Sequence, residues 1–266
     1  MILINMIIIL FLLILILLYY LRSFIIFKKK INNLNKYLDN DNDPIHIISN
    51  DPCKCNRLSK LIPILKCKKC KVPNIINFEN INQVFDFLSK LENKKCNLII
   101  HTEGGASSNA DTLSRLLVEN NINVTTYIPQ YAKSAGTMIA LSSNKIYMNW
   151  YSVMSPIDTQ LYIDDDDMFP AKFIKTIKDK EGTESKDYIR SLEAESVHKV
   201  DEFLLSRILD KNANKQKIIK RILNTKYSHD IDYINKDLKD MGLPIYDEMP
   251  KNITEIFNIY HPLFDL

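Results

Sequence analysis

The first 21 residues constrain this chain more than any other segment, because they are almost wholly apolar, with Asn5 as the one clear polar interruption. A run of this length matches the ~20 residues that an α-helix needs to cross a bilayer. So much apolar surface must be taken out of water, either by lipid or by protein. We therefore expect residues 1–21 to form a transmembrane anchor, with a cleaved or buried segment as the alternative.

The residues after this run indicate its orientation. Arg22 and three lysines at 28–30 follow directly, and Tyr19 and Tyr20 lie at the boundary. Basic residues mark the cytoplasmic side of a span, and tyrosines favour the interface. A secretory signal would need a basic start, a shorter apolar run and a small-residue cleavage site. The sequence predicts a single-pass membrane protein with a cytosolic C-terminal body. Residues 22–44 read as a short helix and a basic, polar juxtamembrane linker.

The rest of the chain, residues 45–266, is long enough for one good-sized core. Its charge excludes one class of partner. The whole chain has a formal net charge of +3. Proteins that bind nucleic acid through the phosphate backbone carry a strong basic field. We expect no nucleic-acid partner.

Short apolar runs alternate with helical patterns along this body. The predicted strands cover residues 45–49, 97–101, 124–128, 145–148 and 153–154. The predicted helices cover residues 80–91, 107–119, 134–142, 169–180, 187–210 and 214–223. Such alternation is typical of βαβ units and predicts an α/β fold with a mainly parallel sheet.

Four cysteines lie in a segment that interrupts this pattern. Residues 50–74 are rich in lysine and proline and read as an irregular insertion, which contains Cys53, Cys55, Cys67 and Cys70. The spacing C-x-C, then C-x-x-C, is close to that of a zinc ribbon. The four thiolates could hold a structural zinc ion. Ordinary thiols in a reducing compartment are the alternative, and disulfides are not expected there.

Glycine is scarce, with five in 266 residues, and its positions draw attention to two segments. Gly104 and Gly105 follow a predicted strand, and Gly136 lies two residues after Ser134, which opens a predicted helix. A diglycine can turn backbone N–H groups outward. With the Ala135 N–H, such a turn could form an oxyanion hole beside a nucleophilic serine. The ordinary alternatives are a tight turn for the glycines and a helix N-cap for the serine.

Residues 98–161 resemble the serine dehydrogenase proteinase family, a membrane-anchored branch of the Clp protease/crotonase superfamily. The resemblance rests on His-Thr-Glu-Gly-Gly at 101–105, Tyr-Ala-Lys-Ser-Ala-Gly-Thr at 131–137 and Ser-Pro-Ile-Asp-Thr-Gln-Leu at 155–161. Met-Gly-Leu-Pro at 241–244 is similar to its closing segment. The resemblance implies a crotonase-like spiral of ββα units, homo-oligomers and polypeptide substrates. It implies no organic cofactor, and the chain has no dinucleotide fingerprint.

The same resemblance points to Ser134 as the nucleophile, Gly105 and Ala135 with Gly104 as the oxyanion hole, and a lysine as the base. Relatives of the signal peptide peptidase A type use a lysine that follows the serine by about 40–50 residues. Lys180 is the favoured candidate, then Lys178 and Lys175; Lys172, Lys186, His198 and His229 are alternatives, and Asp158 could orient the base. A lysine serves as a base when burial lowers its pKa toward neutrality.

The expected function is therefore that of a membrane-anchored serine endopeptidase with a Ser–Lys dyad. One departure bears on it: Glu103 stands where the family usually has proline, and an anion there could oppose the charge of an oxyanion. The main alternative is an inactive membrane scaffold that oligomerises. An acyl-CoA enzyme would use the same oxyanion hole but would not need Ser134.

Overall fold

The centre of the molecule is a six-stranded parallel sheet with the order β10-β6-β4-β3-β1-β2. The computed structural model describes residues 2–38, 45–49, 75–91, 95–158, 160–162, 168–170, 186–223 and 231–264. The strands are β1 (Ile45–Ile48), β2 (Ile75–Ile76), β3 (Lys95–Ile100), β4 (Asn123–Ile128), β6 (Lys145–Met148) and β10 (Ile245–Tyr246). The predicted α/β class and parallel sheet are confirmed.

Strand β3 shows why the chain forms this sheet. It lies between β1 and β4, and its residues from Cys96 to Ile100 are all buried. A continuous apolar run is what a strand covered on both faces requires. Ile99 packs in a cluster with α1 and α9, whereas Leu98 and Ile100 belong to the larger core on the opposite face.

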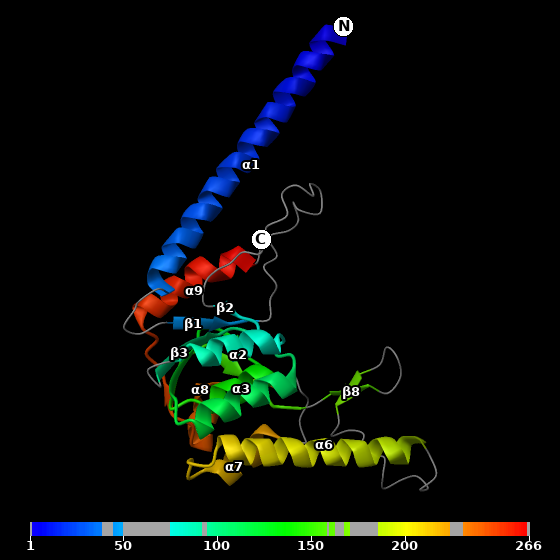
Figure 1. The fold of residues 1–266 in the computed structure, drawn as a ribbon, viewed down its shortest axis with the longest axis vertical. Coiled ribbons are helices and arrows are strands. Elements are labelled where there is room, and N and C mark those ends of the chain that lie inside the picture. Colours follow the sequence, from blue (N-terminus) through cyan, green and yellow to red (C-terminus); the bar gives the residue numbers. More distant parts are fainter. Residues whose placement is uncertain are drawn as a thin grey trace.

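The larger core lies between the sheet and the helices α2 (Ile81–Ser89), α3 (Ser107–Glu119) and α4 (Ala135–Leu141). Every residue of α4 is buried, as its small and apolar sequence predicts. The Ser114 hydroxyl donates to the carbonyl of Met138 at 3.2 Å and ties α3 to α4. The long helix α6 (Lys186–Ile208) lies outside α3, on the side of the body away from α9 (Figure 1).

The other face of the sheet is covered by α9 (Lys251–Phe264) and by the end of α1 (Ile2–Leu38). Leu34 and Leu38 of α1 are fully buried and pack with Ile253 and Phe257 of α9. From there α1 projects away from the body toward the N-terminus (Figure 1). Helix α1 continues through residues 22–38, where a short helix is predicted, and no proline or glycine interrupts it there.

Smaller elements complete the fold. Strands β5 (Tyr131–Ala132) and β7 (Val153–Met154) form a parallel pair, and β8 (Gln160–Tyr162) pairs antiparallel with β9 (Met168–Pro170). Helices α7 (Lys215–Ile222) and α8 (Asn235–Met241) follow α6. The predicted helix over 169–180 is wrong at its first two residues, since pairing with β8 makes them part of a strand.

Several predictions concern residues outside the described part of the chain. Residues 50–74, with all four cysteines of the proposed zinc site, are among them, and so are residues 171–185. The zinc site and the division of the chain into anchor, linker and body therefore stay predictions.

Candidate active site

The two glycine-containing segments meet beyond the carboxyl ends of β3 and β4. In a parallel sheet these ends lie at the same edge, where ligands of α/β proteins usually bind. Thr102 after β3 bridges to Ala132 after β4, and the Lys133 N–H donates to the Thr102 carbonyl at 3.0 Å. Gly136 permits this approach, because a Cβ there would lie 2.5 Å from Cγ2 of Thr102. The fold thus joins segments that are about 30 residues apart in sequence.

Gly104 passes directly over Ser134. An ideal Cβ on Gly104 would lie 2.9 Å from Cβ and 3.5 Å from Oγ of Ser134, so a side chain at this position would collide with the serine. The φ angles of Gly104 and Gly105, +123° and +145°, also belong to a region that other residues rarely adopt. The close contact with Ser134 and the positive φ both require glycine at position 104, whereas at position 105 the positive φ alone requires it.

Ser134 has a strained backbone at the start of α4. Its φ of 47° and ψ of −112° are unusual for a residue other than glycine. An N-cap normally has an extended backbone and a side chain that accepts from the first turn. Ser134 has neither feature, since its side chain makes no capping hydrogen bond. A strained strand-to-helix turn presents the nucleophilic serine in α/β-hydrolases.

A set of buried hydroxyl groups holds this turn in place. Ser155 Oγ accepts from the Ser134 N–H at 2.8 Å and donates to the Pro156 carbonyl at 3.0 Å. Thr137 Oγ1 lies 2.8 Å from the Ala132 carbonyl and 2.9 Å from the Ser155 carbonyl. Sequence reasoning missed both hydroxyls; the signal for Thr137 was a polar residue inside an otherwise apolar helix.

These contacts determine which backbone donors remain open beside Ser134. The Ser134 N–H is taken by Ser155, and the Gly104 N–H donates to Thr102 Oγ1 at 3.1 Å. Gly104 therefore contributes close approach and not a donor. Within the described part of the chain, the N–H groups of Gly105 and Ala135 donate to no protein acceptor. Because Ala135 is only 2% exposed, its open N–H is a costly feature that an arriving oxyanion would satisfy.

The charge of Glu103 is partly compensated. Lys133 Nζ lies 3.5 Å from the Glu103 carboxylate and 3.7 Å from that of Asp232. The Glu103 side chain is 69% exposed, so water screens it as well. Its position beside the diglycine therefore opposes an oxyanion less than the sequence alone indicates. Lys133 is directed to these carboxylates and over the Tyr131 ring, at 5.8 Å from its centroid.

The candidates for the base lie mostly outside the described residues. This is true of Lys175, Lys178 and Lys180, and also of Lys172 and His229. Among the described side chains, none hydrogen-bonds the Ser134 hydroxyl. His198 is on α6 and half-buried, and Asp158 is buried after β7.

His101 lies on the opposite face of the sheet from α4, although it precedes the diglycine in sequence. Its ring is 4.2 Å from that of Tyr131 and 5.1 Å from those of Phe257 and His261, measured between centroids. Side chains alternate along a strand, and Ile99, two residues earlier, also faces α9. His101 is therefore part of an aromatic cluster beneath α9.

Comparison with known proteins identifies the family of this chain. The model of the ClpP-like SDH-type serine proteinases matches residues 1–264. Two uncharacterised proteins of Methanocaldococcus jannaschii are similar to the chain. The first is 26% identical over 174 residues, which make up 64% of this chain and 58% of that protein. The second is 27% identical over 175 residues, which make up 64% of this chain and 59% of that protein. The chain thus spans less than two thirds of the length of these relatives.

Among solved structures, two mutants of the 1510-N membrane-bound stomatin-specific protease, the second with a bound substrate peptide, both have a TM-score of 0.49. Their sequences are 11% and 12% identical to that of this chain. Both alignments cover 81% of this chain; they cover 85% of the first neighbour and 80% of the second. ClpP1 from Listeria monocytogenes has a TM-score of 0.41 at 13% identity, with 77% of this chain and 91% of that chain covered.

Proposed function

The chain belongs to the family of ClpP-like SDH-type serine proteinases, and on that premise we propose that it is a membrane-anchored serine endopeptidase. One observation carries the proposal. The hydroxyl of Ser134 lies at a strained turn directly under Gly104, close to the backbone N–H groups of Gly105 and Ala135, which have no acceptor among the described residues. A nucleophile and two preorganised donors are the parts that acyl transfer needs.

In this mechanism Ser134 Oγ attacks the carbonyl carbon of a peptide bond, and the carbonyl oxygen becomes an oxyanion. The N–H groups of Gly105 and Ala135 stabilise that charge, each by roughly 3 kcal/mol in the transition state. Collapse of the intermediate expels the amine and leaves an acyl-serine, which water then hydrolyses. Ser155 acts as a positioning residue, because its hydroxyl holds the Ser134 N–H and so fixes the turn.

The serine needs a group that removes its proton and returns it to the leaving amine. We propose a lysine for this role, with Lys180 first and then Lys178 and Lys175. The proposal rests on the family resemblance, in which this base follows the serine by about 40–50 residues. A buried lysine of lowered pKa is neutral often enough to accept a proton near pH 7.

The proposed location is a membrane, with α1 as the single span and the catalytic body on the cytosolic side. Helix α1 supports this, because Ile9–Leu38 is long and apolar enough to cross a bilayer. The side chains that project from the body, such as Phe11, Leu17 and Phe24, are more than half exposed. Polypeptides near the membrane are the proposed substrates, and the active form is proposed to be a homo-oligomer.

The test is covalent labelling of the full chain, purified in detergent, by a fluorophosphonate probe. The parent protein should be labelled and should cleave an unfolded protein such as casein. Ser134→Ala should abolish both. Ser89→Ala, which removes an exposed hydroxyl at the end of α2, should change neither. Equal labelling of the parent and Ser134→Ala would contradict the assignment. Complete lack of labelling in an intact oligomer would favour the scaffold.

The lysines are tested in the same assay with separate alanine variants of Lys175, Lys178 and Lys180. A large drop in the labelling rate of one folded variant, together with loss of the acidic limb from the pH–rate profile of its residual activity, would identify the base. Unchanged labelling in all three would exclude them.

A further inference from the structure

The diglycine turn contains the least constrained peptide unit of the proposed site. Gly104 and Gly105 have no side chains to pack, and glycine has more backbone freedom than any other residue. A backbone donor contributes to catalysis when its direction is set before the substrate arrives. The Gly105 N–H therefore needs a group of the folded protein that holds the peptide unit between the two glycines.

Thr102 contacts this peptide unit through its side chain. Its hydroxyl accepts a hydrogen bond from the Gly104 N–H at 3.1 Å and donates one to the Gly104 carbonyl at 3.2 Å. The one proton of the hydroxyl and one of its lone pairs are thus both used on the same glycine. Thr102 is 3% exposed, and a hydrogen bond inside the protein is stronger than one in water. The hydroxyl therefore holds both polar backbone groups of Gly104.

The hydrogen bond to the Gly104 carbonyl also fixes the direction of the Gly105 N–H. The two groups belong to one planar trans peptide unit, in which the C=O and N–H bonds point in opposite directions. With the Gly104 carbonyl directed to Thr102, the Gly105 N–H is directed away from it. That N–H donates to no acceptor among the described residues. The Thr102 hydroxyl thus determines where a donor of the proposed oxyanion hole points.

The rest of Thr102 is attached to the turn that carries Ser134. The Thr102 carbonyl accepts from the Lys133 N–H at 3.0 Å, and the Thr102 N–H donates to the Tyr131 carbonyl at 3.4 Å. Its methyl group Cγ2 lies where a Cβ on Gly136 would come within 2.5 Å. Because a β-branched side chain has few χ1 rotamers, this contact of the methyl group also helps to place the hydroxyl.

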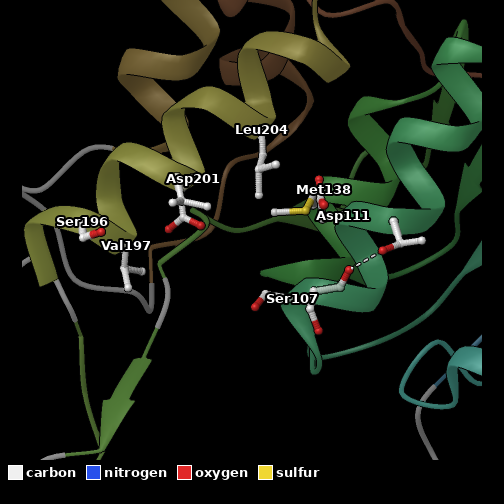
Figure 2. A pocket seen from close by; sticks show the side chains of 10 residues that line it. Ser107, Asp111, Met138, Ser196, Val197, Asp201 and Leu204 are labelled. Atoms are coloured by element: carbon white, nitrogen blue, oxygen red, sulfur yellow. Dashed lines mark hydrogen bonds between the residues drawn. The ribbon is translucent and has the colours of Figure 1, made fainter. Parts of the chain in front are cut away.

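The two ends of the diglycine turn are held by the fold itself. Strand β3 precedes the turn, and α3 begins at Ser107, two residues after Gly105. Ser107 and Met138 of α4 line one cavity of about 430 Å³, and Figure 2 shows them on adjacent helices. The Ser114 hydroxyl joins these helices through the Met138 carbonyl. The part of the turn between these ends is the part that Thr102 holds.

We propose that Thr102 is a positioning residue that directs the Gly105 N–H toward the oxyanion of the peptidase reaction. It acts through the peptide unit between Gly104 and Gly105 and not by contact with the substrate. This inference rests on the proposed peptidase function and adds to it a residue that preorganises the oxyanion hole.

The test compares variants of the full chain in detergent, with fluorescein-labelled casein as the substrate. Thr102→Val keeps a methyl group against Gly136 but has no hydroxyl. Its kcat should fall about tenfold or more while KM stays within about twofold, because an oxyanion donor acts mainly in the transition state. Thr102→Ser keeps the hydroxyl and loses the methyl group. It should lower the melting temperature but keep kcat within about twofold of the parent.

Thr126→Val is the matched control. Thr126 lies on β4, is fully buried, and its hydroxyl is 2.6 Å from that of Ser143. This variant should lower the melting temperature as Thr102→Val does but should leave kcat unchanged. If Thr102→Val does not fold, Thr102→Ala replaces it, because alanine leaves room for a water molecule beside Gly104. If neither folds, Thr102→Ser decides alone: a kcat near that of the parent supports the role, and a tenfold fall overturns it.

Fluorophosphonate labelling of Ser134 in the parent separates the two proposals. If the parent is labelled and Thr102→Val has the same kcat, the role of Thr102 is wrong and the peptidase stands. A fall in kcat that is as large in Thr102→Ser as in Thr102→Val would mean that Thr102 acts through packing, and it would also overturn the role. If the parent shows neither labelling nor cleavage, both proposals fall together.

Discussion

Ser134, the residue proposed as the nucleophile, has a strained backbone. A serine with positive φ costs roughly 1–3 kcal/mol compared with an ordinary conformation. Neighbouring hydrogen bonds must offset that cost, among them the one that the Ser134 N–H donates to Ser155 Oγ. Gly104 packs against the Ser134 side chain, and any residue with a Cβ at position 104 would collide with it.

We predict that Ser155→Ala slows fluorophosphonate labelling of Ser134 by roughly tenfold or more. The variant removes a buried acceptor and should also destabilise the protein by about 1–3 kcal/mol. The matched control is Ser152→Ala. That hydroxyl is equally buried, donates to the Pro129 carbonyl at 2.8 Å and accepts from the Asn149 N–H at 3.0 Å.

Ser152→Ala should therefore cost similar stability but leave the labelling rate close to that of the parent. Labelling rates and thermal melts of both variants separate positioning from general destabilisation. Equal labelling in Ser155→Ala and the parent would exclude the positioning role.

At the scale of elements, the contact between β1 and α2 contains a titratable group. His46 on β1 lies edge-on to Phe87 of α2, with ring centroids 4.8 Å apart. Burial, together with nearby Lys90, lowers the pKa of His46 from 6.5 to about 4. The folded protein therefore holds this imidazole neutral at pH values where the unfolded chain is protonated.

This shift predicts the pH dependence of stability. Between pH 6.5 and 4 the unfolded state binds a proton at His46 that the folded state does not, so acid favours unfolding. The contribution of His46 is complete above pH 6.5 and is lost as the pH falls toward 4, by up to about 3 kcal/mol. His46→Phe keeps an aromatic ring against Phe87 and should flatten this decline. Chemical denaturation followed by circular dichroism at several pH values measures it, and parallel curves for both proteins would refute it.

At the scale of the whole molecule, α1 has two parts with different environments. Its N-terminal part projects from the body with exposed apolar side chains, whereas Leu34 and Leu38 belong to the core beneath α9 (Figure 1). The C-terminal end of this helix is thus packed onto the domain, and we expect its last turns to contribute to the stability of the fold.

We predict different results for two truncations. A chain that begins at Lys28 should fold and stay in solution, because it loses the apolar stretch but keeps Leu34 and Leu38. A chain that begins at Asp39 should lose roughly 3–6 kcal/mol of unfolding free energy, since burying each leucine contributes about 1.5–3 kcal/mol. Flotation with phosphatidylcholine vesicles tests the first expectation, with the full chain as the membrane-bound control. Denaturation tests the second; equal stability of the two truncations would contradict it.

The sequence by itself determined most elements whose signals are local. Helix α3 occupies residues 107–119, as its apolar spacing predicts, and β6 occupies 145–148 as expected. The pair of glycines and the serine before Gly136 also marked the candidate site. Helix α9 was missed although Pro250 and the spacing of Ile253, Ile256 and Phe257 were a readable signal.

Only the tertiary structure decided how these parts meet. It placed Gly104 against Ser134 and engaged the Gly104 N–H with Thr102, while the N–H groups of Gly105 and Ala135 have no acceptor in the part of the chain that the structure describes. It also made strands of short segments such as Ile245–Tyr246, which owe their identity to pairing with β6. The physical reason is the same in each case. Periodicity and propensity act within a few residues, whereas donors, strain and pairing depend on groups that lie far apart in the chain.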